Sequence, residues 1–228
     1  MAVGQGVKRA LALGWPSGTP RRKKGFMFSR RMRGFSLIEM MVVVCLILIV
    51  AGFSIMAIQP SLKQGRVTQG YNTTLMALRQ ARDISVAQRQ IYFVTLNGAV
   101  QPNKITITQG STGIITATYY LPTDVAFDAE PGLPTSPVVP PTTPDGFGAG
   151  ATAIDFDQGI AAGAKNVIYF YPDGSATDVA GNINNGVAYI TRPGDINNSR
   201  AITLWGATGR LRGWHVYKNG AVNYWRQQ

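Results

Sequence analysis

The feature that constrains this chain most is an apolar run from Met40 to Ile58, entered through Phe35. The segment from Phe35 to Ile58 has 24 residues, and none of them is basic. As a helix with a rise of about 1.5 Å per residue it would span roughly 36 Å, more than a hydrocarbon core of about 30 Å. The sequence therefore predicts a transmembrane helix over residues 35–58.

The residues before this segment carry the charge that orients it. Nine basic residues and no acidic residue precede Gly34, namely Lys8, Arg9, Arg21, Arg22, Lys23, Lys24, Arg30, Arg31 and Arg33. By the positive-inside rule, this end stays in the cytoplasm and the rest of the chain lies across the membrane. Without residues 1–34, thirteen basic and eleven acidic residues remain, so global basicity is no argument for nucleic-acid binding.

The small residue of a secretory cleavage site follows the apolar core, whereas here Gly34 precedes it. Gly34, Phe35 and Glu39 at these offsets resemble the class III signal of type IV pilins and type II secretion pseudopilins. The resemblance implies that prepilin peptidase cleaves after Gly34, that residues 1–34 are a leader, and that Phe35 becomes N-methylated. Met27 is an alternative start that would leave a compact leader.

Glu39 is a carboxylate inside the apolar segment. Because such a group costs about 2.5–3.5 kcal/mol on insertion scales, it should have a partner. The resemblance implies that this partner is the α-amino group of Phe35 on a neighbouring subunit, so both residues would act in filament assembly. The alternative is a carboxylate near the membrane interface that snorkels or is protonated.

Beyond the membrane segment, Pro60 predicts a kink, after which a helix resumes over about residues 61–89. Residues at three- and four-residue spacing form a stripe that should pack against a sheet: Val67, Tyr71, Leu75, Leu78, Ala81 and Ser85. The arginines on its other faces, Arg79, Arg82 and Arg89, are expected to be solvated. Residues 59–89 would thus be the periplasmic half of one long helix.

From Gln90 the pattern changes to short β-branched and aromatic runs separated by turn residues, which favours antiparallel sheets. Strands are predicted at residues 91–96, 105–108, 114–121, 153–156, 166–171, 187–191, 201–205, 211–217 and 222–225. Residues 130–150 hold six prolines and four glycines and are expected to be an exposed, flexible loop. The predicted fold class is α+β, pilin-like, with a β-rich head domain over residues 90–228.

Three stretches make the resemblance to pilins and pseudopilins more specific: Val167–Ser175, Arg200–Leu204 and Gly209–Arg212. They resemble the C-terminal half of the GspH/FimT group of minor pseudopilins and minor type IV pilins, which help to form or cap a filament tip. The resemblance implies a bacterial inner-membrane protein with one span and a periplasmic C-terminal domain, extracted into a filament. Its partners would be other pilins or pseudopilins, prepilin peptidase and the inner-membrane assembly platform.

The stretch Gly209–Arg212 also raises an alternative function, because a Gly-Arg-x-Arg motif contributes to DNA binding in DNA-uptake members of this group. Residues 192–228 hold six basic residues and one acidic residue, with aromatic residues between them, a mixture that suits phosphate contact and stacking. The candidate DNA-binding residues are Arg200, Arg210, Arg212 and Lys218. Alternating arginines on an exposed hairpin equally block edge-to-edge aggregation.

Charge is unevenly distributed, since residues 124–178 hold eight acidic residues and one basic residue. This asymmetry suits the steering of an anionic ligand, and docking between unlike subunits equally well. The single histidine, His215, and the single cysteine, Cys45 in the apolar run, cannot form a zinc site or a nucleophile–base pair. We expect no catalytic residue, metal site or cofactor, and no enzyme activity.

The processing prediction is tested by changing the residue at the cleavage point. Gly34→Ala, or a bulkier residue there, should leave the leader attached, because the resemblance implies that the peptidase requires this glycine. Intact mass and N-terminal sequencing of the purified native chain measure the outcome. A mature wild-type chain that begins anywhere other than Phe35 would refute the prediction.

Overall fold

The computed structural model describes residues 34–150, 152–158 and 166–228. The predicted leader therefore lies outside the described residues, apart from Gly34. One α-helix, α1 (Leu37–Gln88), runs through Pro60, where the sequence predicted a kink and a restart. A proline removes a single backbone donor, and the turns on either side keep their own hydrogen bonds. By length and composition, α1 is long and apolar enough to cross a membrane.

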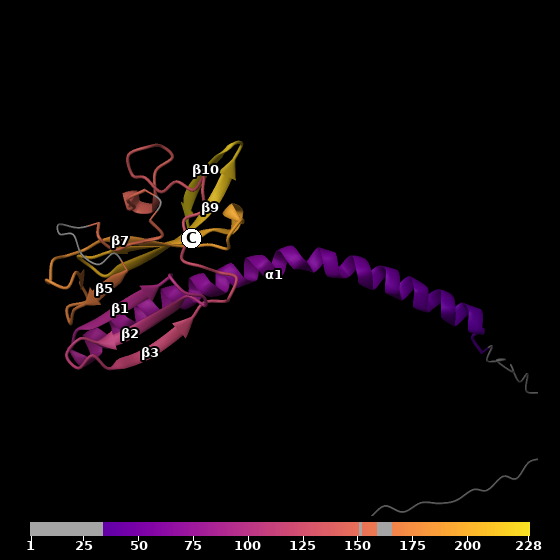
Figure 1. Ribbon diagram of the computed structural model, residues 1–228, viewed down its shortest axis with the longest axis horizontal. Helices are drawn as coiled ribbons and strands as arrows, with labels where there is room; N and C mark the ends of the chain where they lie inside the picture. The colour runs from indigo at the N-terminus through magenta and orange to yellow at the C-terminus, as the bar shows by residue number, and fades with distance from the viewer. Residues whose placement is uncertain (1–33, 151, 159–165) are drawn as a thin grey trace, which may run out of the picture. The chain divides into compact units, whose positions relative to one another are not determined.

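The strands of the described residues form two antiparallel sheets (Figure 1). Sheet 1 has the order β3-β2-β1-β5-β6, with β1 (Tyr92–Asn97), β2 (Lys104–Gln109), β3 (Ile115–Tyr120), β5 (Val167–Phe170) and β6 (Ala176–Thr177). Sheet 2 has the order β10-β9-β8-β7-β4, with β4 (Ile154–Asp155), β7 (Gly186–Ile190), β8 (Arg200–Trp205), β9 (Arg210–Asn219) and β10 (Val222–Gln227). The expected α+β class is confirmed, and β6 is a strand that the sequence did not reveal.

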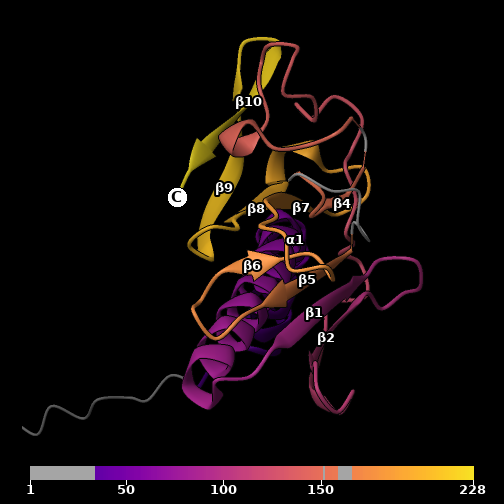
Figure 2. The same ribbon diagram turned by 90° about the vertical axis from the view of Figure 1, so that its left-hand side faces the viewer.

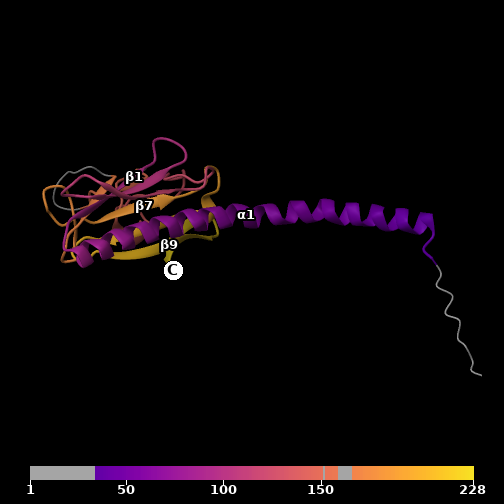
Figure 3. The same ribbon diagram turned by 90° about the horizontal axis from the view of Figure 1, so that it is seen from below.

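The predicted stripe of α1 packs against both sheets (Figures 2 and 3). Val67, Leu78 and Ala81 are fully buried, together with Thr74 and Ala77, which widen the stripe. Sheet 1 contributes Val94, Leu96, Ile105, Ile107, Ile168 and Phe170 to this core, and sheet 2 contributes Ala188, Ile190, Ile202 and Leu204. Because a fully buried aliphatic side chain contributes roughly 1.5–3 kcal/mol, this core holds the head domain together.

The two sheets are joined where β6 meets the end of β8. The backbone N–H of Ala176 donates to the carbonyl of Gly206 at 2.7 Å, and Asn184 N–H donates to the carbonyl of Ala176 at 3.1 Å. A Cβ on Gly206 would lie 2.3 Å from the Asn184 carbonyl oxygen and 2.7 Å from that of Ala176. Glycine is therefore required at this junction, because any side chain would push the sheets apart.

The proline-rich loop over residues 130–150 differs from the exposed, flexible loop that the sequence predicted. Leu133 and Phe147 are buried with Val187, Tyr189, Ala201, Val216 and Trp225 in a second core on the face of sheet 2 opposite α1. Trp225 Nε1 donates to the Pro134 carbonyl at 3.0 Å. The loop packs because its two large apolar residues reach that face, while Val138 and Val139 near its tip stay exposed.

Two glycine substitutions test this packing in opposite directions. Gly206→Ala should lower the free energy of unfolding by about 1–3 kcal/mol, as overpacking does. Gly65→Ala should raise it by about 0.5–1 kcal/mol, because Gly65 lies in α1 with nothing within 4 Å of an added Cβ. Denaturation of the detergent-solubilised chain, followed by tryptophan fluorescence, measures both. Equal stability of the two variants would contradict the junction described here.

Candidate functional site

The predicted processing site lies at the start of α1. Gly34 is exposed and lies outside regular structure, Phe35 is 74% exposed, and the helix begins at Leu37. The N–H of Glu39 donates to Ser36 Oγ at 3.2 Å, so Ser36 caps the helix. Ser36 and Glu39 fit the S-x-x-E spacing of a capping box, which is a sequence signal for this helix start.

This start places Glu39 in the first helical turn, where a carboxylate is favoured by the partial positive charge of the helix terminus. Among the described residues, Glu39 forms no ion pair within the chain. The side chains from Leu37 to Leu48 are exposed. Glu39 is likewise exposed.

The second predicted site, the basic hairpin of β8 and β9, has Arg210 and Arg212 on one face. Arg210 pairs across the sheet with Trp205, and Arg212 pairs with Thr203. Arg210 is exposed. Arg212, in contrast, forms an ion pair of 2.7 Å with Asp145 and lies over the ring of Trp205, with 5.8 Å between its Cζ atom and the ring centroid. The motif thus presents one free arginine and one that is already paired.

Asp145 binds three groups of sheet 2 at once. Besides Arg212, it accepts hydrogen bonds from Thr203 Oγ1 at 2.5 Å and from Trp205 Nε1 at 3.1 Å. Its side chain is 6% exposed, and its backbone has a φ of 53°, a left-handed conformation that is uncommon outside glycine. These bonds hold the proline-rich loop against the face of sheet 2 that carries Arg210 and Arg212.

The other two candidate DNA-binding residues do not join Arg210 on one surface. Arg200 lies on the opposite face of β8, is 6% exposed, and donates from Nη2 to Thr68 Oγ1 at 3.3 Å. Strand alternation explains this, since Arg200, Ile202 and Leu204 all face α1. Lys218 is exposed near the far end of β9, paired with Asn223. Arg200 is therefore excluded from any DNA-binding surface of the described domain.

Burial dominates the electrostatics around Arg200. It lowers the pKa of Arg200 and raises that of Tyr71, whose hydroxyl lies where a Cβ on Gly213 would be. The pKa of His215 is lowered, first by burial and then by the charge of Arg200. His215 is therefore a neutral, half-buried residue of the domain interior. No group of three or more His, Cys, Asp or Glu residues that could hold a metal exists within the described ranges.

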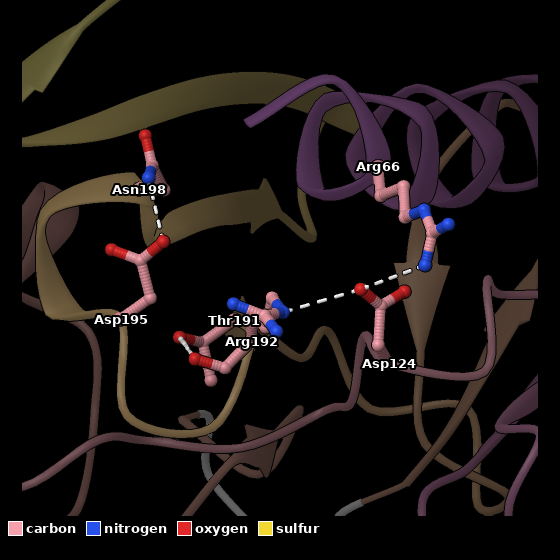
Figure 4. A network of polar contacts seen from close by, with 6 residues as sticks. All are labelled: Arg66, Asp124, Thr191, Arg192, Asp195 and Asn198. Atoms are coloured by element: carbon pink, nitrogen blue, oxygen red, sulfur yellow. Dashed lines mark hydrogen bonds and ion pairs between the residues drawn. The ribbon is translucent and has the colours of Figure 1, made fainter. Parts of the chain in front are cut away.

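The acidic and basic segments of the chain fold onto each other, which reduces the charge asymmetry noted in the sequence. Asp124 forms ion pairs of 3.2 Å with Arg66 of α1 and with Arg192 after β7 (Figure 4). Asp145 pairs with Arg212 in the same way. The acids of these ion pairs, Asp124 and Asp145, tie the acidic segment to α1 and to sheet 2.

A groove between α1 and the β8–β9 turn was not predicted. It has a volume of about 310 Å³ and is lined by Arg79, Arg82, Asp83, Thr208, Gly209, Arg210 and Leu211. Arg82, expected to be solvated, is half-buried and donates to the carbonyl oxygens of Gly174 at 3.2 Å and Thr208 at 3.1 Å. Arg79 and Arg82 lie three residues apart on one side of the helix, a spacing visible in the sequence, but the contacts of Arg82 with the turns at Gly174 and Thr208 depend on tertiary packing.

Comparisons with known proteins agree with the N-terminal features. A family model described as the prokaryotic N-terminal methylation motif matches residues 29–55. Among solved structures, a crystal structure of the type IV minor pilin FimU from Pseudomonas aeruginosa matches with 13% sequence identity. That match has a TM-score of 0.39 and covers 68% of this chain and 89% of FimU. A comparison with curated protein sequences found no match.

The role assigned to Asp145 is tested by removing its carboxylate. Asp145→Ala should lower the free energy of unfolding by about 1–3 kcal/mol, because hydrogen bonds to a largely buried charge are lost and Arg212 is left unpaired. It should also speed proteolysis within residues 130–150. Asp128→Ala, at an exposed acid of the same segment, is the matched control and should change neither quantity. Unchanged proteolysis in Asp145→Ala would show that the loop is held by its apolar residues alone.

Proposed function

We propose that this chain is a minor subunit of a type II secretion pseudopilus or a type IV pilus, processed after Gly34 and assembled at or near the filament tip. The observation that carries the proposal is the methylation motif over residues 29–55, which overlaps the start of an unburied apolar helix. Such a subunit needs a membrane anchor that remains after processing and a folded head, and it supports protein secretion or pilus assembly. It requires no catalytic residue.

In this proposal the chain spans the bacterial inner membrane once, with the head domain in the periplasm. Prepilin peptidase removes the leader and methylates Phe35, and the assembly platform extracts the chain into the filament. The exposed Glu39 then meets the α-amino group of Phe35 on a neighbouring subunit. The absence of an intrachain ion pair for Glu39 among the described residues supports this role, because the carboxylate would otherwise enter the membrane uncompensated.

A second candidate function is DNA binding by the head during DNA uptake. It is favoured by Arg210, which is exposed beside β8 and has no carboxylate partner among the described residues. Free guanidinium groups bind phosphate well. Salt-dependent retardation of duplex DNA by the solubilised chain is the measurement that tests this function.

The assembly role is tested at Glu39. Glu39→Ala should leave membrane insertion and leader removal intact but strongly reduce the fraction of processed chain that co-sediments with filament subunits, because its ionic contact with a neighbour is lost. Asp83→Ala removes an exposed acid from the other half of α1 and should co-sediment like the wild type. If the Glu39→Ala chain co-sedimented as well as the wild type, Glu39 would act only in stabilising the start of the helix.

A further inference from the structure

Strand β3 is the outer strand of sheet 1, and one of its two edges has no neighbouring strand (Figure 1). The N–H of Leu121 donates to the carbonyl of Asn103 at 2.9 Å, which fixes the alternation of hydrogen bonds between β3 and β2. In an antiparallel pair every second residue bonds to the partner strand, so Thr118 and Tyr120 turn their backbone N–H and C=O groups outward. Within the described ranges these groups bond to nothing else. The edge therefore offers two donors and two acceptors to an incoming strand.

This edge lacks the features that usually keep sheet edges from pairing. Exposed edges in soluble proteins are commonly blocked by charged residues, prolines or bulges. No charged residue lies between Lys104 and Asp124, and the register shift at Ile107 and Thr108 falls before the part of β3 that holds Thr118. At the other edge of sheet 1, β6 is bonded to the segments around it. Strand β3 thus presents an open edge on a folded head domain.

An apolar hollow on α1 lies next to β3. It has a volume of about 530 Å³ and is lined by one flank of the helix: Met76, Arg79, Gln80, Asp83, Ile84 and Ala87. Gln80 places this hollow beside β3, because its Oε1 accepts a hydrogen bond from the Tyr119 hydroxyl. Met76 is 68% exposed. Because side chains alternate along a strand, those of an added strand that share the side of Tyr119 would lie toward the hollow.

We propose that the free edge of β3 and the hollow beside it bind an extended segment of another polypeptide, which adds a sixth strand to sheet 1. The edge supplies main-chain hydrogen bonds, and apolar residues at alternate positions of the segment cover Met76 and Ile84. The segment is uncharged where it meets β3, because a charge there would lose hydration without gaining a partner. The inference goes beyond the proposed function, since neither processing nor Glu39 enters into it.

The partner is not β3 of a second copy of this chain. Two β3 strands that pair edge to edge in the antiparallel manner of this sheet are related by a twofold axis perpendicular to the sheet. The head half of α1 packs on the sheet, so its two copies would run in opposite directions. Chains anchored in one membrane by the residues before Pro60 cannot enter such a pair from opposite sides, an argument that rests on the anchoring proposed above.

The test uses a synthetic peptide with the sequence of residues 114–121, a fluorescent label, and lysines added at both ends for solubility. Its strand is uncharged and carries apolar residues at alternate positions, the two properties that the surface requires. Fluorescence anisotropy measures its binding to the full-length chain in an uncharged detergent. A control peptide with proline in place of Ala117 and Thr118 lacks a donor on each of its edges and should not bind.

Thr118→Pro in the chain should weaken binding of the peptide about fivefold or more, because an outward donor of the edge is lost. The fold should be kept, since this N–H faces away from β2, and unchanged thermal unfolding checks it. Thr118→Val retains the donor and is the matched control, which should bind like the wild type. Met76→Ser should weaken binding about threefold through lost apolar contact. Val139→Ser, at a residue that is 65% exposed in the proline-rich loop, should leave binding unchanged.

Each other outcome counts against a defined part of the proposal. If the wild-type chain does not bind the peptide, binds the proline peptide equally well, or binds no better than Thr118→Pro, the edge of β3 is not a docking site. If Met76→Ser binds like the wild type, the hollow is not part of the site. If the wild-type chain sediments as a dimer and Thr118→Pro as a monomer, the edge pairs with a second copy, and the assignment to a different chain is wrong.

Discussion

The structure depends on the burial of one stripe of α1 against two sheets. Leu78 and Ala81 belong to one core with buried residues of both sheets, and the sheets meet each other where no side chain can be accommodated, at Gly206. This packing sets the rotation of the helix. Because a stripe occupies one face, Arg79 is turned outward and Arg82 is brought to the edge of the buried surface, next to the β8–β9 turn. The contacts of Arg82 with the Gly174 and Thr208 carbonyls are thus a consequence of how the core is packed.

A second layer of structure changes the chemistry of the C-terminal hairpin. The proline-rich loop covers the face of sheet 2 opposite α1, and Asp145 binds the arginine that ends the Gly-Arg-x-Arg motif. The carboxylate of Asp145 offsets the positive charge of Arg212, and partial burial limits access to the guanidinium group. The motif is therefore divided: Gly209 packs against the helix, Arg210 is free, and Arg212 supports the loop. A motif with two arginines need not present two binding groups.

Much of the fold could be predicted because it depends on local periodicity. The stripe from Val67 to Ser85 was found from helical spacing, and most strands from alternation between turn signals. The two-residue strand β6 was missed, because a segment that short has no period and is defined by its contacts with β5 and Gly206. The prolines and glycines of residues 130–150 predict an exposed, flexible loop, but Leu133 and Phe147 bury themselves against the apolar face of sheet 2.

By itself the sequence determined the membrane-length apolar helix, the positions of Gly34, Phe35 and Glu39 before and within it, and a β-rich domain after it, because each follows from neighbours in the chain and from local hydrophobic pattern. Tertiary structure alone decided which charges are free. Whether an arginine is buried like Arg200, paired like Arg212 or open like Arg210 depends on segments more than fifty residues away, which bring Thr68 and Asp145 into contact with the sheet. Composition sets how many charged side chains the chain carries, but packing decides which of them remain exposed and unpaired.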